Sequence, residues 1–159
     1  MSDKKESNRF ATLAVHSGTQ HIGDAVNTPI FQSSTYKLTD ERYAGWAAGA
    51  QHTLLYARLS TVNCDAVAQK LAAMEQGEDA ETFSSGMGAI STTLLALLNE
   101  GDHMVASADI YGGTYGLLTE ELCRFGLSTT MADMRDPASY EAAIQPNTKI
   151  IYIETLTNP

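Results

Sequence analysis

Between residues 80 and 154 the sequence alternates short apolar runs with longer segments of helical periodicity. The predicted strands are Ala80–Phe83, His103–Ser107, Ser128–Ala132 and Lys149–Glu154. The predicted helices are Gly86–Leu98, Thr114–Phe125 and Pro137–Ala143. A strand, a helix and a second strand in succession make a right-handed crossover, so this order predicts an α/β fold, a mostly parallel sheet with helices on both faces. The apolar, β-branched residues of the last strand predict burial on both of its faces.

The ends of the predicted helices carry residues suited to them. Asp136 can cap a helix whose first turn contains Pro137, and Gly126 follows the end of another. A further helix is predicted over Asp65–Gln76, with Gly77 ending it.

The first part of the chain shows little sustained periodicity. Short helices are predicted over Ala11–His16 and Asp40–Ala50, and an extended segment over Thr28–Tyr36. A long and weakly regular segment of this kind usually packs on something larger than itself. We therefore expect an N-terminal arm that precedes the compact region.

The net charge of −9 argues against nucleic-acid binding, which requires clustered Lys and Arg, and against binding to an anionic membrane surface. Cys64 and Cys123 form no plausible metal cluster with the histidines, so no metal site is predicted. No apolar segment reaches the length of a membrane span, and a cytoplasmic location is expected.

The stretch from Ser84 to Ala89 lies where the first predicted strand passes into a helix. Small residues there allow close approach of a ligand, and the helix start offers unpaired N–H groups that suit a phosphate. The hydroxyl of Ser85 can cap the helix or contact a phosphate oxygen. Taken alone, the stretch leaves open an ordinary capped helix start.

Three polar segments follow the ends of predicted strands. They are Ser84–Met87, Asp109–Thr114 and Glu154–Asn158. The carboxyl ends of parallel strands meet at one edge of a sheet, where ligands of such folds bind. The topology therefore predicts one cleft that contains all three segments.

These segments, together with the upstream Tyr56-Ala57-Arg58, resemble in order and spacing the pyridoxal-phosphate (PLP) enzymes of cysteine and methionine metabolism. That family includes cystathionine γ-synthase, cystathionine γ- and β-lyases, methionine γ-lyase and O-acetylhomoserine sulfhydrylase. The resemblance implies the large domain of a fold-type-I PLP enzyme. Residues 1–60 would be an arm that makes oligomer contacts, and residues 61–159 the first, incomplete half of the PLP-binding domain.

The resemblance also implies roles for residues. Ser85 and the backbone N–H groups of Gly86 and Met87 would bind the cofactor phosphate. Tyr111 would stack on the pyridine ring and take part in catalysis, and Asn158 would donate to the phenolic oxygen of PLP.

Tyr56 and Arg58 would reach the phosphate of the neighbouring subunit. The implied assembly is a homodimer with shared active sites, within a homotetramer. The sequence departs from the family pattern after Arg58, where Leu59–Asn63 lacks the usual proline, and at Leu156, which replaces another proline.

No lysine stands in the sequence context that the family uses to bind PLP covalently. We therefore expect the chain to be the N-terminal portion of a longer enzyme, inactive by itself. The implied activity is a γ-lyase that eliminates a thiol from methionine, cystathionine or homocysteine. γ-Replacement, by O-acetylhomoserine sulfhydrylase or cystathionine γ-synthase, stays open, because Gly113 stands where many methionine γ-lyases have cysteine.

Two readings from other classes also stay open. A doubly wound domain with a glycine turn can bind a nucleotide, although the sequence has neither G-x-G-x-x-G after the first strand nor G-x-x-x-x-G-K-[ST]. The chain could also be a non-catalytic association fragment.

Overall fold

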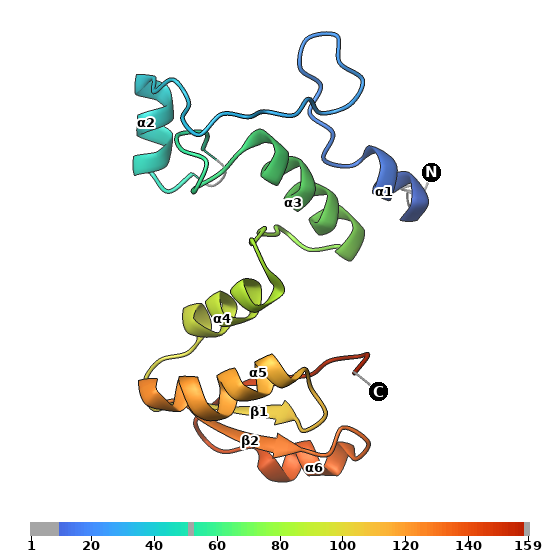
Figure 1. Ribbon diagram of the computed structural model, residues 1–159, viewed down its shortest axis with the longest axis vertical. Coiled ribbons are helices and arrows are strands. Elements are labelled where there is room, and N and C mark those ends of the chain that lie inside the picture. Colours follow the sequence, from blue (N-terminus) through green and yellow to red (C-terminus); the bar gives the residue numbers. More distant parts are fainter. Residues whose placement is uncertain (1–9, 51–52, 158–159) are drawn as a thin grey trace, which may run out of the picture. The chain divides into compact units, whose positions relative to one another are not determined.

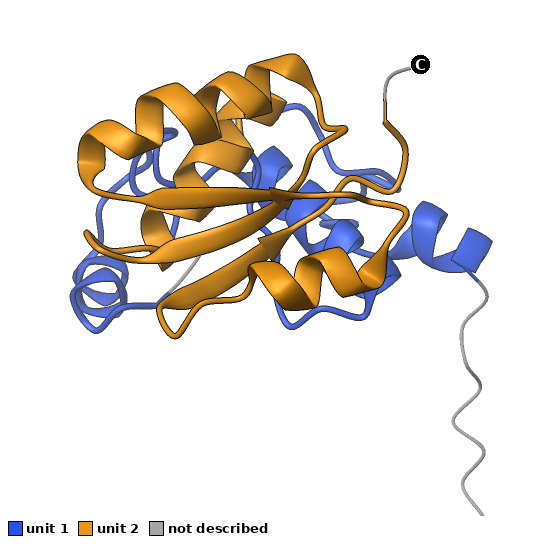
Figure 2. Ribbon diagram, turned by 90° about the horizontal axis from the view of Figure 1, so that it is seen from below, with its two compact units in different colours: residues 1–82 blue, residues 83–159 orange. Residues whose placement is uncertain are grey.

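The computed structural model describes residues 10–50 and 53–157. The chain divides into two compact units, Met1–Thr82 and Phe83–Pro159, coloured separately in Figure 2. The third helix of the chain thus belongs to the first unit together with the arm. The domain boundary predicted from the sequence, between residues 60 and 61, stays a prediction about the whole protein.

The first unit contains the helices α1 (Phe10–His16), α2 (Asp40–Ala47) and α3 (Val62–Glu75), joined by long extended segments (Figure 1). The two short helices predicted in the arm are confirmed. Helix α1 packs on α3, where Lys70 Nζ donates to the carbonyl oxygens of Ala14 and Val15 at 2.9 and 3.0 Å.

Side chains at the start of α3 connect it to the extended segment. Thr61 caps the helix by accepting from the Cys64 N–H at 3.1 Å. Asn63 accepts from the Phe31 N–H at 2.8 Å and donates to the Pro29 carbonyl at 2.9 Å. The arm is therefore held by hydrogen bonds in place of a continuous core.

The end of α3 differs from the prediction. Gln76, with φ of 57°, takes the left-handed position, and not Gly77. Helix α3 therefore ends one residue earlier than it would if Gly77 were the left-handed residue. The Gly77 N–H donates to the Ala72 carbonyl at 2.9 Å.

The second unit is built on a parallel sheet of three strands in the order β2-β1-β3. The strands are β1 (His103–Ser107), β2 (Ser128–Ala132) and β3 (Thr148–Tyr152). The helices are α4 (Gly86–Leu97), α5 (Gly112–Gly116) and α6 (Pro137–Ala143). Beyond α5 the chain continues as the π-helical turn η1 (Leu117–Glu121) and the 3₁₀ turn η2 (Leu122–Phe125). The predicted α/β class with a parallel sheet is confirmed.

Three expectations for this unit are corrected. Residues 80–83 form no strand in the described chain, because neither free edge of the sheet pairs with them and an extended segment needs a partner for its hydrogen bonds. Strand β3 is not buried on both faces: Ile151 is 51% exposed, and α6 packs mainly against β2. The single predicted helix 114–125 begins at Gly112 and changes its winding at Leu117.

The change of winding coincides with side chains that bind helix carbonyls. Thr119 Oγ1 donates to the Tyr115 carbonyl at 2.8 Å, and Thr129 Oγ1 of β2 donates to the Leu118 carbonyl at 3.4 Å. Gly126, with φ of 76°, then ends the helical segment in the left-handed conformation.

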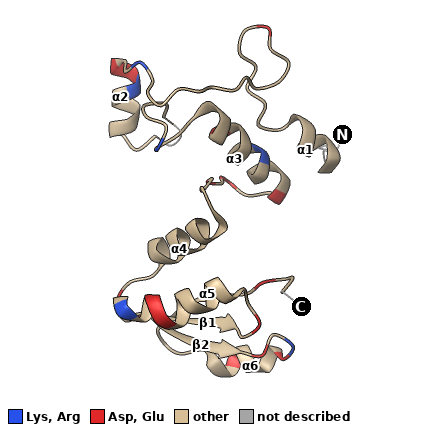
Figure 3. Cartoon of the chain, viewed as in Figure 1, with Lys and Arg blue, Asp and Glu red and all other residues tan. Residues whose placement is uncertain are grey.

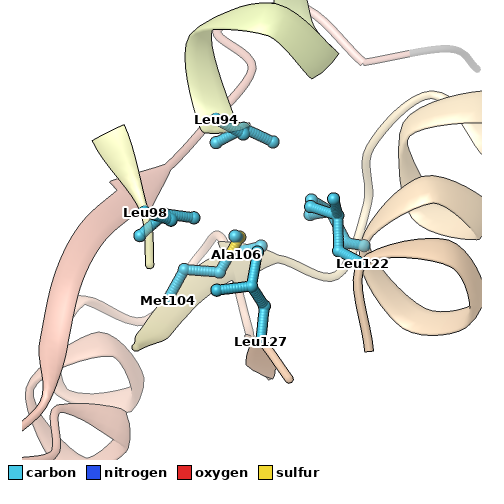
Figure 4. Close-up of a cluster of buried hydrophobic side chains, with 7 residues drawn as sticks. Leu94, Leu98, Met104, Ala106, Leu122 and Leu127 are labelled. Atoms are coloured by element: carbon cyan, nitrogen blue, oxygen red, sulfur yellow. The ribbon is translucent and has the colours of Figure 1, made fainter. Parts of the chain in front are cut away.

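The core lies between the sheet and the helices of one face (Figure 4). It consists of Leu94, Leu98, Met104, Ala106, Leu118, Leu122 and Leu127. Strand β1 contributes the centre, because it is flanked by both other strands and buried along its length. Helix α6 covers the other face (Figure 2), where Tyr140 Oη and Ser107 Oγ are 2.7 Å apart.

A buried histidine, the first residue of β1, joins the three strands. His103 Nδ1 lies 2.7 Å from Thr148 Oγ1 of β3, and His103 Nε2 lies 2.9 Å from Thr130 Oγ1 of β2. The amide of Gln145 lies 3.1 Å from the same Nε2. This network fixes the strands at the edge opposite to the one where the predicted site residues lie.

Candidate functional site

The start of α4 has open backbone donors at the carboxyl edge of the second unit. Ser85 is the N-cap and accepts from the Gly88 N–H at 3.0 Å. The N–H groups of Gly86 and Met87 have no hydrogen-bond partner among the described residues. Helix α4 carries no charged side chain (Figure 3), so no carboxylate on it repels an anion at its positive end. The helix start therefore fits a phosphate group.

The turn between β1 and α5 presents an aromatic ring. Tyr111 is the N-cap residue of α5, and its side chain is 50% exposed. The ring lies close to Gly113: a Cβ added at that glycine would be 2.5 Å from Tyr111 Cε1. Glycine at position 113 thus lets the ring lie against the first turn of α5.

Glu154, two residues beyond β3, joins these segments. Its Oε2 accepts from the Tyr111 N–H at 3.0 Å, and its Oε1 accepts from the Tyr152 hydroxyl at 3.2 Å. Burial is the largest influence on the pKa of Tyr152 and raises it, a hydrogen bond with Thr114 lowers it, and the charge of Glu154 raises it further. Thr114 is fully buried and lies 3.8 Å from Met87 Sδ through its hydroxyl.

The structure therefore brings Met87, Tyr111 and Glu154 together at the carboxyl edge of one unit, as the topology predicted. The described part of the second unit contains one lysine, Lys149. It is the second residue of β3 and lies toward the amino end of that strand. Within the described chain no group of three or more His, Cys, Asp or Glu could hold a metal ion. None of the helices described is long and apolar enough to cross a membrane.

Tyr56 and Arg58 belong to the first unit. The guanidinium carbon of Arg58 lies 5.0 Å from the centroid of the Tyr56 ring, so the two side chains are brought together. Tyr56 forms an isolated antiparallel bridge with Thr35 and is 41% exposed. No ion pair engages Arg58 in the ranges that the structure describes. Asn158 lies outside the described residues.

Sequence reasoning missed the links among the site segments. Thr114 and Glu154 belong to the polar segments that the sequence singled out. The spacing of residues along the chain did not indicate that Thr114 contacts Met87, or that Glu154 accepts from a backbone N–H 43 residues away. The available signal was the position of Glu154, just beyond a strand that ends at the same edge.

The chain was compared with known proteins. A family profile described as "Cys/Met metabolism PLP-dependent enzyme" matches residues 11–159. The chain is 43% identical over 152 residues to an L-methionine gamma-lyase of Porphyromonas gingivalis, with 94% of this chain covered. It is also 43% identical to a cystathionine gamma-lyase of Bacillus subtilis, with 93% of this chain covered. In both alignments the chain spans 38% of the relative's length.

A solved structure is similar as well. A Campylobacter jejuni protein assigned as an O-acetylhomoserine (thiol)-lyase has a TM-score of 0.87 at 33% identity. The match covers 95% of this chain and 38% of the other. That structure contains N'-pyridoxyl-lysine-5'-monophosphate, a lysine joined to the cofactor.

Proposed function

The chain belongs to the family of Cys/Met metabolism PLP-dependent enzymes, and we propose that its protein is a γ-lyase acting on sulfur-containing amino acids. Methionine, cystathionine and homocysteine are the proposed substrates, with a thiol as the leaving group. The observation that carries the proposal is the meeting of an open helix start and the Tyr111 turn at one sheet edge, in a chain of this family.

The described residues fit the cofactor. The N–H groups of Gly86 and Met87 would bind the phosphate, because Ser85 occupies the next donor and leaves these two open. The ring of Tyr111 would stack on the pyridine, and its hydroxyl would hold or move a proton near the leaving group. PLP itself supplies an electron sink for the carbanion at Cα of the substrate. Asn158 is proposed as the donor to the phenolic oxygen.

γ-Replacement is the second candidate reaction, in which a thiol or sulfide replaces the acyloxy group on the γ-carbon of a homoserine ester and the carboxylic acid leaves. Gly113 favours γ-replacement. Many methionine γ-lyases have a cysteine side chain at this position beside the stacking tyrosine, whereas glycine has only a hydrogen atom there. Relatives named as lyase and as synthase have similar identities to this chain, 43% for an L-methionine gamma-lyase and 42% for a probable cystathionine gamma-synthase of Herpetosiphon aurantiacus.

A homo-oligomer with shared sites is also proposed. The exposed pair of Tyr56 and Arg58 can offer a guanidinium and a hydroxyl to a phosphate. We propose that this phosphate belongs to the neighbouring subunit of a dimer, and that two dimers form a tetramer in the cytoplasm.

The test begins with the visible absorption of the full-length protein and its retention of PLP after dialysis. The protein is then supplied with methionine, cystathionine or homocysteine, and separately with O-acetylhomoserine and sulfide. A γ-lyase releases a thiol, ammonia and 2-oxobutanoate, whereas γ-replacement yields a new thioether or thiol amino acid without the oxo acid. A protein that neither retains PLP nor releases any of these products would contradict the proposed function.

A further inference from the structure

The carboxylate of Glu154 connects two segments that meet at the carboxyl edge of the sheet. Glu154 follows β3, whereas Tyr111 lies in the turn that follows β1. One carboxylate oxygen accepts from the Tyr111 N–H at 3.0 Å, and the other accepts from the Tyr152 hydroxyl at 3.2 Å. Both oxygens therefore have protein donors.

The connection continues toward the start of α4. The Tyr152 hydroxyl donates to Glu154 at 3.2 Å, and Thr114 belongs to α5, the helix that begins at the Tyr111 turn. Thr114 is fully buried, and its Oγ1 lies 3.8 Å from Met87 Sδ. The first turns of α5 thus connect the Tyr111 turn, held by Glu154, with the helix start that is proposed to bind phosphate.

Apart from Glu154, the Tyr111 backbone is held by its own helix, because the Tyr111 carbonyl accepts from the Tyr115 N–H at 2.9 Å. The N-cap of α5 makes no side-chain capping hydrogen bond, and half of the Tyr111 side chain is exposed. The direction of the ring therefore depends on the backbone of its own residue, whose N–H side is held by the bond to Glu154.

We propose that Glu154 is a positioning residue, whose carboxylate holds the Tyr111 backbone at the start of α5, the helix whose Thr114 contacts Met87 of α4, in the arrangement that receives the cofactor. This inference rests on the proposed function, because it concerns how the PLP site is held. It assigns Glu154 no proton transfer, since both oxygens are engaged by donors of the protein.

Two substitutions separate positioning from charge. In Glu154→Gln the amide oxygen can accept from the Tyr111 N–H while the amide NH₂ donates to the Tyr152 hydroxyl, so both links persist without charge. Glu154→Ala removes both links. Glu141→Ala, which removes an exposed carboxylate from α6, is the matched control for the loss of one negative charge.

The first readout does not depend on the cofactor. Hydrogen–deuterium exchange of the full-length protein without PLP is followed by mass spectrometry in the peptide that spans residues 109–113. We expect exchange to accelerate roughly three- to tenfold in Glu154→Ala, the range for one lost hydrogen bond at a partly exposed site. Glu154→Gln and Glu141→Ala are expected to match the wild type.

The second readout is the dissociation constant for PLP, together with the visible circular dichroism of the bound cofactor, which reports its orientation. Glu154→Ala should raise the dissociation constant by a similar factor, roughly three- to tenfold, and change the dichroism. Glu154→Gln should retain both values.

Three results would overturn the proposal: unchanged exchange in Glu154→Ala, unchanged PLP binding in the same variant, or a glutamine variant as impaired as the alanine variant. The third result would assign the role to the charge and not to the geometry. The proposed function fails separately, if the wild-type protein itself retains no PLP.

Discussion

At the scale of single residues, Gly113 determines where the ring of Tyr111 can lie. A Cβ at position 113 would be 2.5 Å from Tyr111 Cε1 and 3.1 Å from Cζ, so in Gly113→Ala the ring must rotate away. The ring is half exposed and has room to move, so the fold should persist. Because the ring leaves its position for stacking, we expect PLP affinity to fall by about 1 kcal/mol, or roughly fivefold.

Gly112→Ala is the control, since a Cβ at that glycine meets nothing within 4 Å. Both substitutions place alanine in the first turn of α5 and should leave stability unchanged or raise it by about 0.4–1 kcal/mol. PLP titration and denaturant unfolding of both variants measure the two effects. Equal PLP affinities in the two variants would show that the ring position does not matter for binding.

Tyr152 gives a pH dependence with a defined sign. Its pKa is raised above the ordinary 10.0, chiefly by burial, so folding favours the protonated phenol. The resulting stability is fully present below about pH 10 and is lost as the pH rises through the higher pKa of the folded state. Tyr152→Phe lacks this contribution. Unfolding free energies from about pH 8 to pH 11 should therefore fall more steeply for the wild type than for the phenylalanine variant. A constant difference between the two proteins across that range would contradict the assignment.

At the scale of elements, the sequence predicted β1, β2 and α6 with the bounds that the structure shows. These elements have local signals: the apolar centre of β1, the consecutive threonines of β2, and Asp136 with Pro137 at the start of α6. The strand predicted at residues 80–83 has no pairing partner in the described chain. Strand pairing is a non-local property, and sequence periodicity cannot report it.

The site was predictable to a similar extent. The topology placed Tyr111 and Glu154 at one edge, because both follow strands that end there, and it placed Met87 there by way of a strand at residues 80–83 that the structure does not show. It did not indicate that the Glu154 carboxylate accepts from the Tyr111 backbone or that Thr114 contacts Met87, since such contacts depend on side-chain conformations. Nor did it indicate the π-helical turn at Leu117–Glu121.

Helix α4 offers a matched test of the core at this scale. Leu94 is 3% exposed and belongs to the core cluster, whereas Leu97 is 60% exposed on the same helix. Leu94→Ala removes buried carbon atoms and leaves a cavity, so it should lower the free energy of unfolding by about 2–5 kcal/mol. Leu97→Ala, with the same change of side chain, should lower it by less than about 1 kcal/mol. Denaturant midpoints of both variants provide the comparison, and similar losses would show that the helix packs by a different face.

At the scale of the whole molecule, the proposed oligomer assigns a role to Arg58 that lies outside its own subunit. Arg58 lies in the first unit and is 5.0 Å from the ring of Tyr56, while Tyr111 lies in the second. If Arg58 serves the phosphate of the neighbouring subunit, Arg58→Ala leaves that phosphate without a charged hydrogen-bond donor, at a cost of about 1.5–3 kcal/mol in PLP binding. Its effect then falls on the partner's site and not on its own.

Co-expression of Arg58→Ala and Tyr111→Ala full-length chains separates the two possibilities. In a mixed dimer with shared sites, one site receives the intact Tyr111 of the first chain and the intact Arg58 of the second. Random pairing would make roughly a quarter of all sites intact, so activity should rise well above that of either variant alone. If Arg58 serves its own chain, every site in the mixed dimer carries one defect and activity stays low. Thiol release by affinity-purified mixed dimers, with each chain carrying a different tag, measures the outcome. Low activity in dimers shown to be mixed would place Arg58 in the site of its own subunit.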